Sequence, residues 1–283
     1  MKCGVTMFAT DVSAPVADVA RAAEARGFHS LWLPEHTHIP TSRRTPPPTG
    51  DSVLAEEYKR TLDPLVALAT AAALTSTIRL GTGIALPAQR EPIVTAKAVA
   101  TLDHVSGGRV DFGIGYGWNA DELAHHGVAM NERRAVVRER VMAMQALWTQ
   151  EVAAYHGTHV EFAENWSWPK PVQPRLPELL GGAAGPTLFA HIAEYGQGWI
   201  PVGGAGVAAS LPGLYEACVA ADRDPADVRI VPFGSFPTPG KLDHYAQAGV
   251  TECVFRLPSA GLGEVTRALD EWTAVVREWA GES

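Results

Sequence analysis

Two residues suited to proton transfer, Glu35 and His36, follow a short apolar run at Ser30–Leu33. Histidine has an ordinary pKa of about 6.5, so its imidazole can give or take a proton near neutral pH. A neighbouring carboxylate can orient the imidazole or raise its basicity. We therefore predict that His36 and Glu35 are catalytic residues for an acid–base step. The alternative is a histidine that only hydrogen-bonds a bound ring or a loop.

A second candidate set consists of glycines at the ends of apolar runs. Gly83 falls within the run at residues 78–86, and Gly115 and Gly117 directly follow Val110–Ile114. If both runs are parallel strands, their carboxyl ends open onto one crevice. A residue without a Cβ lets a flat ligand approach the backbone closely. We therefore predict that these glycines line a cofactor-binding site. The alternative, for Gly81 and Gly83, is tight packing at the end of the sheet.

A third glycine-rich stretch, residues 181–187, precedes a helical pattern. The N–H groups at a helix N-terminus carry partial positive charge, and glycines let a phosphate come close. The stretch predicts an anion cradle at Gly182, Gly185, Pro186 and Thr187, with a structural turn as the alternative. The helix that follows offers no Lys or Arg, only His191.

A metal site is the other chemistry that the histidines suggest. His36 and His38 have the His-x-His spacing of metal-dependent barrel hydrolases, but such a site needs further ligands at later strand ends. The runs that end near residues 181 and 201 supply no histidine. We therefore predict that the protein holds no metal, and we assign His125 and His126 to a solvated helix end.

Strand-like and helix-like segments alternate along the chain. The apolar runs are short and continuous, which favours a parallel sheet covered by helices. A barrel of this kind ordinarily needs about 250 residues, and the chain has 283. We predict one α/β domain over residues 1–283, a (β/α)8 TIM barrel. The eight strands are expected at residues 3–8, 30–33, 78–86, 110–114, 178–180, 198–202, 228–233 and 252–257.

Two segments are too long to be plain connections. Residues 37–60 follow the second expected strand, and residues 150–177 lie between the fourth unit and the fifth strand and contain Trp166 and Trp168. Long loops in compact folds are often lids or binding loops. We expect both segments to cover a substrate, with a tolerated insertion as the alternative.

The composition limits the partners. The net charge is −8, and the Lys and Arg residues form no cluster that would attract nucleic acid or an anionic membrane. No run of about 18 apolar residues could span a bilayer. Three cysteines, Cys3, Cys218 and Cys253, are widely spaced, so we expect buried thiols in a reducing cytoplasm.

Several motifs, taken together and in order, resemble the bacterial luciferase-like superfamily. Within it, the resemblance is closest to oxidoreductases that use the deazaflavin coenzyme F420, and it covers nearly the whole chain. The motifs lie at residues 25–36, 78–84, 96–103, 106–109, 113–118, 181–182 and 198–199.

The resemblance also implies a set of site residues. In this family the bond that maps to Gly83–Ile84 is a cis peptide that bulges against the ring system. The implied ring contacts on one face are Thr82, Gly83 and Ile84, with Tyr116, Gly117 and Trp118 nearby. The phosphate is expected at Gly182, Gly185, Pro186 and Thr187. A homodimer is the usual assembly of the family.

One feature distinguishes the chain from a sugar-phosphate dehydrogenase branch of the family. In that branch a histidine at the place of His36 is an active-site residue, but its acidic partner falls where this chain has Trp118. An indole ring offers an apolar or stacking surface. We therefore expect an uncharged, fairly hydrophobic small-molecule substrate.

The expected function is hydride transfer between C5 of F420 and this substrate, with His36 assisting proton transfer. The coenzyme carries the chemistry, and the protein binds, orients and excludes water. An FMN-dependent monooxygenase of the same superfamily and a coenzyme-binding homologue without turnover remain alternatives.

Overall fold

The computed structural model describes residues 1–47, 53–204 and 206–281. Its main sheet is curled, and every strand pair in it is parallel. The strand order is β10-β11-β1-β2-β3-β4-β7-β8-β9. The strands are β1 (Lys2–Thr6), β2 (Ser30–Leu33), β3 (Arg79–Thr82), β4 (Val110–Ile114), β7 (Glu178–Gly181), β8 (Gly198–Ile200), β9 (Arg229–Ile230), β10 (Phe233–Ser235) and β11 (Glu252–Arg256).

The seventh expected strand, residues 228–233, is broken into β9 and β10. Pro232 lies at the break and has no N–H to donate. Backbone bonds nevertheless continue on both sides, because the Val231 N–H donates to the Trp199 carbonyl and the Val254 N–H donates to the Pro232 carbonyl. The strands at the two ends of the strand order, β10 and β9, are therefore consecutive in the chain.

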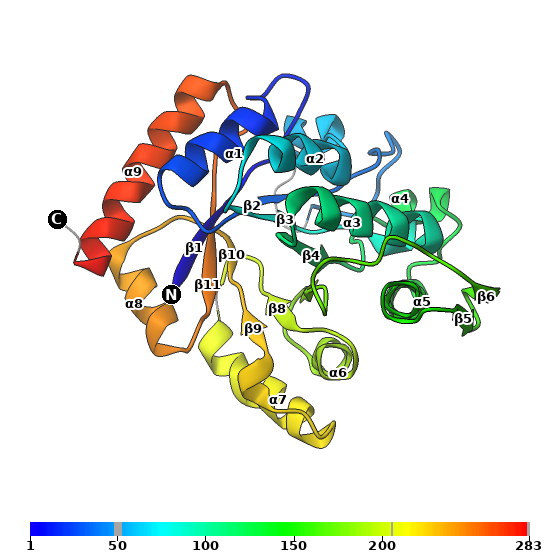
Figure 1. Cartoon of the computed structure of the whole chain (residues 1–283). Helices are drawn as coiled ribbons and strands as arrows, with labels where there is room; N and C mark the ends of the chain where they lie inside the picture. The colour runs from blue at the N-terminus through cyan, green and yellow to red at the C-terminus, as the bar shows by residue number, and fades with distance from the viewer. Residues whose placement is uncertain (48–52, 205, 282–283) are drawn as a thin grey trace.

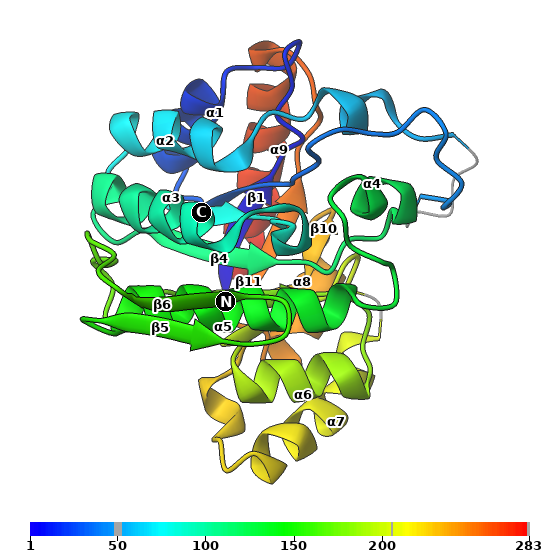
Figure 2. The same ribbon diagram turned by 90° about the vertical axis from the view of Figure 1, so that its right-hand side faces the viewer.

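All helices except α4 lie on the outer side of the curled sheet, and α4 lies beyond the carboxyl end of β4 (Figures 1 and 2). Asp63 shows how they begin, because its carboxylate accepts the N–H groups of Leu65 and Val66 at the start of α2. The longer helices are α1 (Val16–Ala25), α2 (Pro64–Leu74), α3 (Pro92–Ser106), α4 (Ala120–His125), α5 (Arg133–Thr149), α6 (Pro186–Glu194), α7 (Val207–Ala220), α8 (Pro239–Gln247) and α9 (Leu262–Ala280). Three short 3₁₀ turns are η1 (Glu56–Arg60), η2 (Pro87–Gln89) and η3 (Pro225–Asp227).

Side chains fill the inside of the curled sheet. The carboxyl-terminal part holds an apolar cluster of Trp32, Leu179, Ile200, Val231, Phe233 and Val254, with Ile84 packed against it. At the amino-terminal part, Asp111 is fully buried between Arg79 and Arg229, each 2.7 Å away. The interior is thus a packed core.

The segment at residues 150–177 contradicts the sequence prediction. It contains an antiparallel hairpin of β5 (Ala153–His156) and β6 (Glu161–Asn165), which runs beside α5 in Figure 2. The Gln173 side chain donates to the carbonyl of Val110, the first residue of β4, and the Val172 N–H donates to Asp103. The segment therefore lies at the amino ends of the strands, where it cannot cover a substrate bound at the carboxyl ends.

Candidate functional site

The carboxyl ends of β3, β4 and β7 meet around one side chain, Ile84. A Cβ placed on Gly115 would come within 2.3 Å of the Ile84 Cδ1 atom, and a Cβ on Gly181 within 2.7 Å. Ile84 is itself half-buried. The expected convergence of these three strand ends is confirmed, and the Gly83–Ile84 peptide bond is cis, as the resemblance implied.

The glycines at the strand ends also leave room for protein side chains. A Cβ on Gly83 would lie 2.2 Å from the Phe233 ring, and Gly115 accommodates Ile84. Gly117 is required for its backbone, because its φ of +80° lies in the left-handed region. The backbone is thus tightly packed at Gly83 and Gly115, and the predicted contact of Gly83 and Gly117 with a ring stays a prediction.

The side chain of Thr82 is also buried within the sheet. Its side chain is 1 % exposed, and its hydroxyl donates to the Gly113 carbonyl at 2.7 Å. The hydroxyl thus links β3 to β4, and the predicted contact of Thr82 with a ring stays a prediction.

His36 pairs with a carboxylate that the sequence analysis did not identify. Its Nδ1 atom lies 3.0 Å from Oε2 and 3.1 Å from Oε1 of Glu122, in α4. The two side chains are 6 % and 1 % exposed. A carboxylate at this nitrogen favours the tautomer with the proton on Nδ1 and leaves Nε2 as an acceptor. His36 is therefore paired with a carboxylate that lies four residues after Trp118.

Glu35 does not orient His36. Its Oε1 atom accepts from the Arg90 Nε atom at 2.6 Å, and its Oε2 atom accepts the Leu86 N–H at 2.7 Å. Glu35 is 3 % exposed, so its ion pair with Arg90 is buried and holds the segment after β3 in position. Both carboxylate oxygens of Glu35 therefore accept hydrogen bonds from this segment and not from the imidazole.

Aromatic rings enclose the other side of His36. The rings of Tyr58 and Trp118 lie 5.3 and 5.8 Å from the His36 ring, measured between centroids. The Arg43 guanidinium lies 5.8 Å from the Trp118 ring centroid. Asn119 follows Trp118, is 1 % exposed, and its amide has no hydrogen-bond partner among the described residues. These groups form an amphipathic wall around the imidazole.

The loop after β2 folds over α4 at this same end of the molecule (Figure 2). Asp121 accepts the backbone N–H of Arg44 at 2.8 Å and its guanidinium at 3.0 Å. His38 and His125 hydrogen-bond through Nε2 and Nδ1 at 2.8 Å. The described part of the loop therefore lies where a substrate cover is expected, while residues 48–52 of the predicted cover fall outside the described residues.

Tyr116 faces away from His36 and toward α6. Its hydroxyl lies 2.8 Å from the Nδ1 atom of His191, which also lies 3.2 Å from the Tyr195 hydroxyl. Burial lowers the pKa of His191 and raises the pKa of both tyrosines, so the three groups are neutral at pH 7. The exposed Arg134 guanidinium lies 5.7 Å from the Tyr116 ring and supplies a cation that α6 lacks.

The start of α6 has the form expected of an anion cradle. The helix begins at Pro186 after Gly185, and no described side chain caps it. A Cβ on Gly185 would meet no described atom within 4 Å, and Thr187 is exposed. Gly182 precedes this loop and accepts the Trp199 indole N–H through its carbonyl. The first N–H groups of α6 are thus open to an anion.

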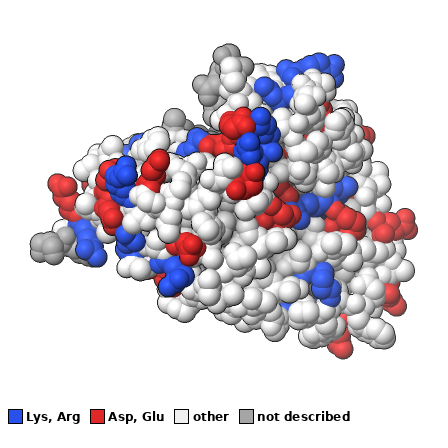
Figure 3. Space-filling model, turned by 90° about the horizontal axis from the view of Figure 1, so that it is seen from above, with Lys and Arg blue, Asp and Glu red and all other residues white. Residues whose placement is uncertain are grey.

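Within the described residues, no group of three or more His, Cys, Asp or Glu side chains could hold a metal ion, and no helix is long and apolar enough to cross a membrane. His125 is exposed and ends α4, as predicted. In Figure 3, Lys and Arg side chains are interspersed with Asp and Glu side chains.

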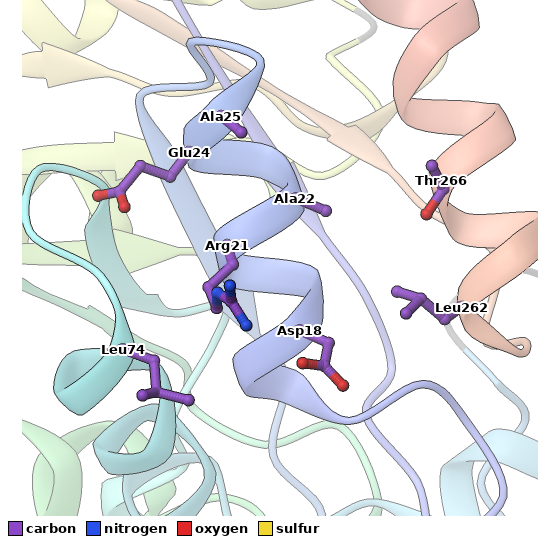
Figure 4. A pocket seen from close by; sticks show the side chains of 8 residues that line it. All are labelled: Asp18, Arg21, Ala22, Glu24, Ala25, Leu74, Leu262 and Thr266. Carbon is purple, nitrogen blue, oxygen red and sulfur yellow. The ribbon is translucent and has the colours of Figure 1, made fainter.

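A groove of about 480 Å³ lies elsewhere, on the outer helices. Figure 4 shows α1 side chains on both sides of the helix, with Leu262 and Thr266 of α9 facing it. The Glu24 carboxylate in this groove accepts hydrogen bonds from the backbone N–H groups of residues 76–78. The groove is remote from the strand ends and has no group arranged for chemistry.

Comparisons with known proteins agree with the geometry. The family model of luciferase-like monooxygenases matches residues 6–254. A Mycobacterium tuberculosis protein described as uncharacterized is 44 % identical over 285 residues, covering 100 % of this chain and 98 % of its own length. An F420-dependent glucose-6-phosphate dehydrogenase of Beutenbergia cavernae is 34 % identical over 217 residues, covering 74 % of this chain and 60 % of that protein.

A solved structure supports the fold. An F420-dependent secondary alcohol dehydrogenase, in complex with an F420–acetone adduct, superposes with a TM-score of 0.78 at 17 % identity. The superposition covers 97 % of this chain and 98 % of that one.

Proposed function

Because the chain belongs to the luciferase-like monooxygenase family, we propose that it is an oxidoreductase that uses coenzyme F420. The substrate is a small organic molecule that interconverts between an alcohol and a carbonyl form. The observation that carries the proposal is the buried His36–Glu122 pair at the carboxyl end of the sheet. The F420-dependent relative at 34 % identity supports the choice of coenzyme.

The residues at the strand ends fit a ring with an anionic tail. Ile84 is half-buried at the meeting point of β3, β4 and β7 and would contact one face of the ring. The open first turn of α6, from Gly185 to Thr187, would hold the tail phosphate. The Arg134 guanidinium lies beside Tyr116 and would add positive charge between these two regions. When bound, the deazaflavin supplies the hydride acceptor or donor.

His36 would move the proton that accompanies the hydride. With Glu122 accepting from Nδ1–H, the Nε2 lone pair takes the proton of a substrate hydroxyl as its carbon gives up hydride. In the reverse direction Nε2–H returns the proton to the carbonyl oxygen. Glu122 holds the imidazole plane and stabilises the imidazolium, and Trp118 and Tyr58 exclude water from it.

The substrate is proposed to be uncharged and fairly hydrophobic, because rings surround the imidazole. Arg43 lies beside Trp118 and gives a reason to test an anionic substrate as well. Counting β9 and β10 as one strand broken at Pro232, we also propose that the sheet is a closed (β/α)8 barrel. The FMN-dependent monooxygenase and the homologue without turnover are the alternatives.

The proposal is tested by turnover with F420 and a panel of primary alcohols, secondary alcohols and sugar phosphates, followed by the absorbance of the oxidised coenzyme. We expect turnover, and we expect His36→Ala to lower kcat by about 10²–10⁴-fold with unchanged coenzyme affinity. The control is His104→Ala, an exposed histidine in α3. Full activity of His36→Ala would contradict its proposed role, and binding without turnover across the panel would favour the coenzyme-binding homologue without turnover.

A further inference from the structure

Two of the three cysteines, far apart in the sequence, lie side by side in the fold. Cys3 in β1 and Cys253 in β11 are directly paired in neighbouring parallel strands. Their sulfur atoms lie 3.7 Å apart, although 250 positions separate the residues. Cys3 is 8 % exposed and Cys253 is fully buried, and all three cysteines are free thiols.

The pair points outward, into the core between the sheet and the helices. Side chains alternate across a strand, so Val254 joins the cluster inside the curled sheet while Cys3 and Cys253 belong to the outer core. Both cysteines are second residues of their strands, toward the amino ends. The pair is thus separate from the carboxyl-end site, and Cys218 lies apart from it in α7.

We propose that Cys3 and Cys253 form a redox-modification site, which a hydroperoxide converts into an intramolecular disulfide. The bond would join the first strand of the chain to its last strand.

The geometry allows this bond without separating the strands. Neighbouring strands lie about 4.8 Å apart, and Cα atoms joined by a disulfide usually lie about 4.4–6.8 Å apart. The sulfurs must approach from 3.7 Å to about 2.05 Å, which requires side-chain rotation. Direct pairing in the strand register already places both side chains on the same face of the sheet.

The two thiols have different roles in the oxidation. Cys3 is the more exposed of the two residues, and its hydrogen bond with Cys253 lowers the pKa of Cys3 and raises the pKa of Cys253. The Cys3 thiolate attacks the O–O bond of the hydroperoxide, forms a sulfenic acid and releases an alcohol, or water if the oxidant is hydrogen peroxide. The Cys253 sulfur then attacks the Cys3 sulfur, the S–O bond breaks, and water leaves with the Cys253 proton. The two thiols lose two electrons and the peroxide gains them.

The test is oxidation of the folded full-length chain with hydrogen peroxide, followed by thiol titration in denaturant and mass spectrometry. We expect the free thiols to fall from three to one, and the intact mass to fall by two hydrogen atoms. Peptides containing Cys3 and Cys253 should be linked, and dithiothreitol should reverse the change. Three remaining thiols, a bond involving Cys218, or Cys3 oxidised to sulfinic acid without a crosslink would overturn the proposal.

Two variants give matched controls. Cys218→Ser keeps the pair and should crosslink as the natural chain does. Cys253→Ser removes the resolving thiol, so its Cys3 sulfenic acid should persist and react with dimedone. Because the linked peptide is measured in the natural chain, the test stands even if Cys253→Ser folds poorly. The crosslink encloses most of the chain and should raise Tm by several degrees.

Discussion

His36 and Glu122 are 86 positions apart in the sequence, and their side chains meet at about 3.0 Å. At the scale of single residues, this contact decides what the imidazole can do. A carboxylate fixed at Nδ1 selects the tautomer and leaves Nε2 to the substrate. Since both side chains are buried, loss of the carboxylate changes the orientation of the ring more than its exposure to water.

Glu122→Gln should therefore lower kcat by about 10–100-fold and leave coenzyme affinity unchanged, because partners that orient a histidine ring typically contribute this much. Steady-state kinetics and coenzyme titration measure the two quantities separately. Glu132→Gln changes an exposed carboxylate beyond α4 and serves as the control. Equal losses in kcat and coenzyme binding would show that Glu122 maintains the fold and does not position His36.

The sequence identified His36 but assigned it the wrong partner. Glu35 and His36 are adjacent after β2, but Glu35 accepts from Arg90 instead, and His36 pairs with Glu122. Glu122 depends on how the chain turns after β4 and enters α4, and spacing alone does not show this. The sequence feature that could have indicated Glu122 is its position as a carboxylate in the first turn of a short helix, four residues after Trp118.

Among the elements, the convergence of the strand ends was predictable from the sequence, but the position of the connection at residues 150–177 was not. The apolar runs and the glycines after them predicted that β3, β4 and β7 converge, since parallel strands present their carboxyl ends together. The segment at residues 150–177 was wrongly placed, because it follows α5 and so returns the chain to the amino ends. The hairpin in it has polar and exposed residues, so no apolar pattern indicated a strand there.

The start of β7 also makes stability depend on pH. Glu178 is 2 % exposed, and burial raises its pKa from 4.5 to about 7, although Gln145 and Gln197 donate to it. The folded state therefore binds more protons than the unfolded state between about pH 4.5 and 7. Glu178 should therefore contribute a fall of about 3 kcal/mol to the free energy of unfolding as pH rises through this window, a contribution measured as the difference between the natural chain and Glu178→Gln.

Chemical denaturation at pH 5 and at pH 8 checks this. Glu178→Gln should remove the contribution of Glu178, because the side chain no longer titrates, so the stability of this variant relative to the natural chain should rise from pH 5 to pH 8. Glu161→Gln, an exposed residue of β6, should keep the natural profile. The same pH dependence in the natural chain and in Glu178→Gln would contradict the prediction.

At the scale of the whole molecule, one outer face lacks a partner in a single chain. The sequence from Pro64 to Ile78 contains no charged residue, yet Val66 and Leu74 of α2 are 70 % and 56 % exposed. In the neighbouring helix α3, Val94 is 67 % exposed. A helix that is apolar all round is normally covered. We propose that a second copy of the chain covers this face, in a symmetric dimer.

Sedimentation at micromolar concentration should then give twice the chain mass of 30.2 kDa. Val66→Glu should shift the protein to the monomer, because a charge would be buried at the contact. Val219→Glu, on α7 and 66 % exposed, should leave the mass unchanged. A natural chain that sediments as a monomer would contradict the proposed dimer.

The central claim is that the ends of β3, β4 and β7 hold a deazaflavin whose anionic tail rests on α6. Fluorescence titration of the protein with F420 and with FMN tests it most directly. We expect saturable binding of F420 in preference to FMN. Gly185→Asp, which places a negative charge at the open start of α6, should weaken binding about tenfold, while Gly263→Asp in the first turn of α9 should not. Binding of FMN alone, or equal F420 affinity in both variants, would contradict it.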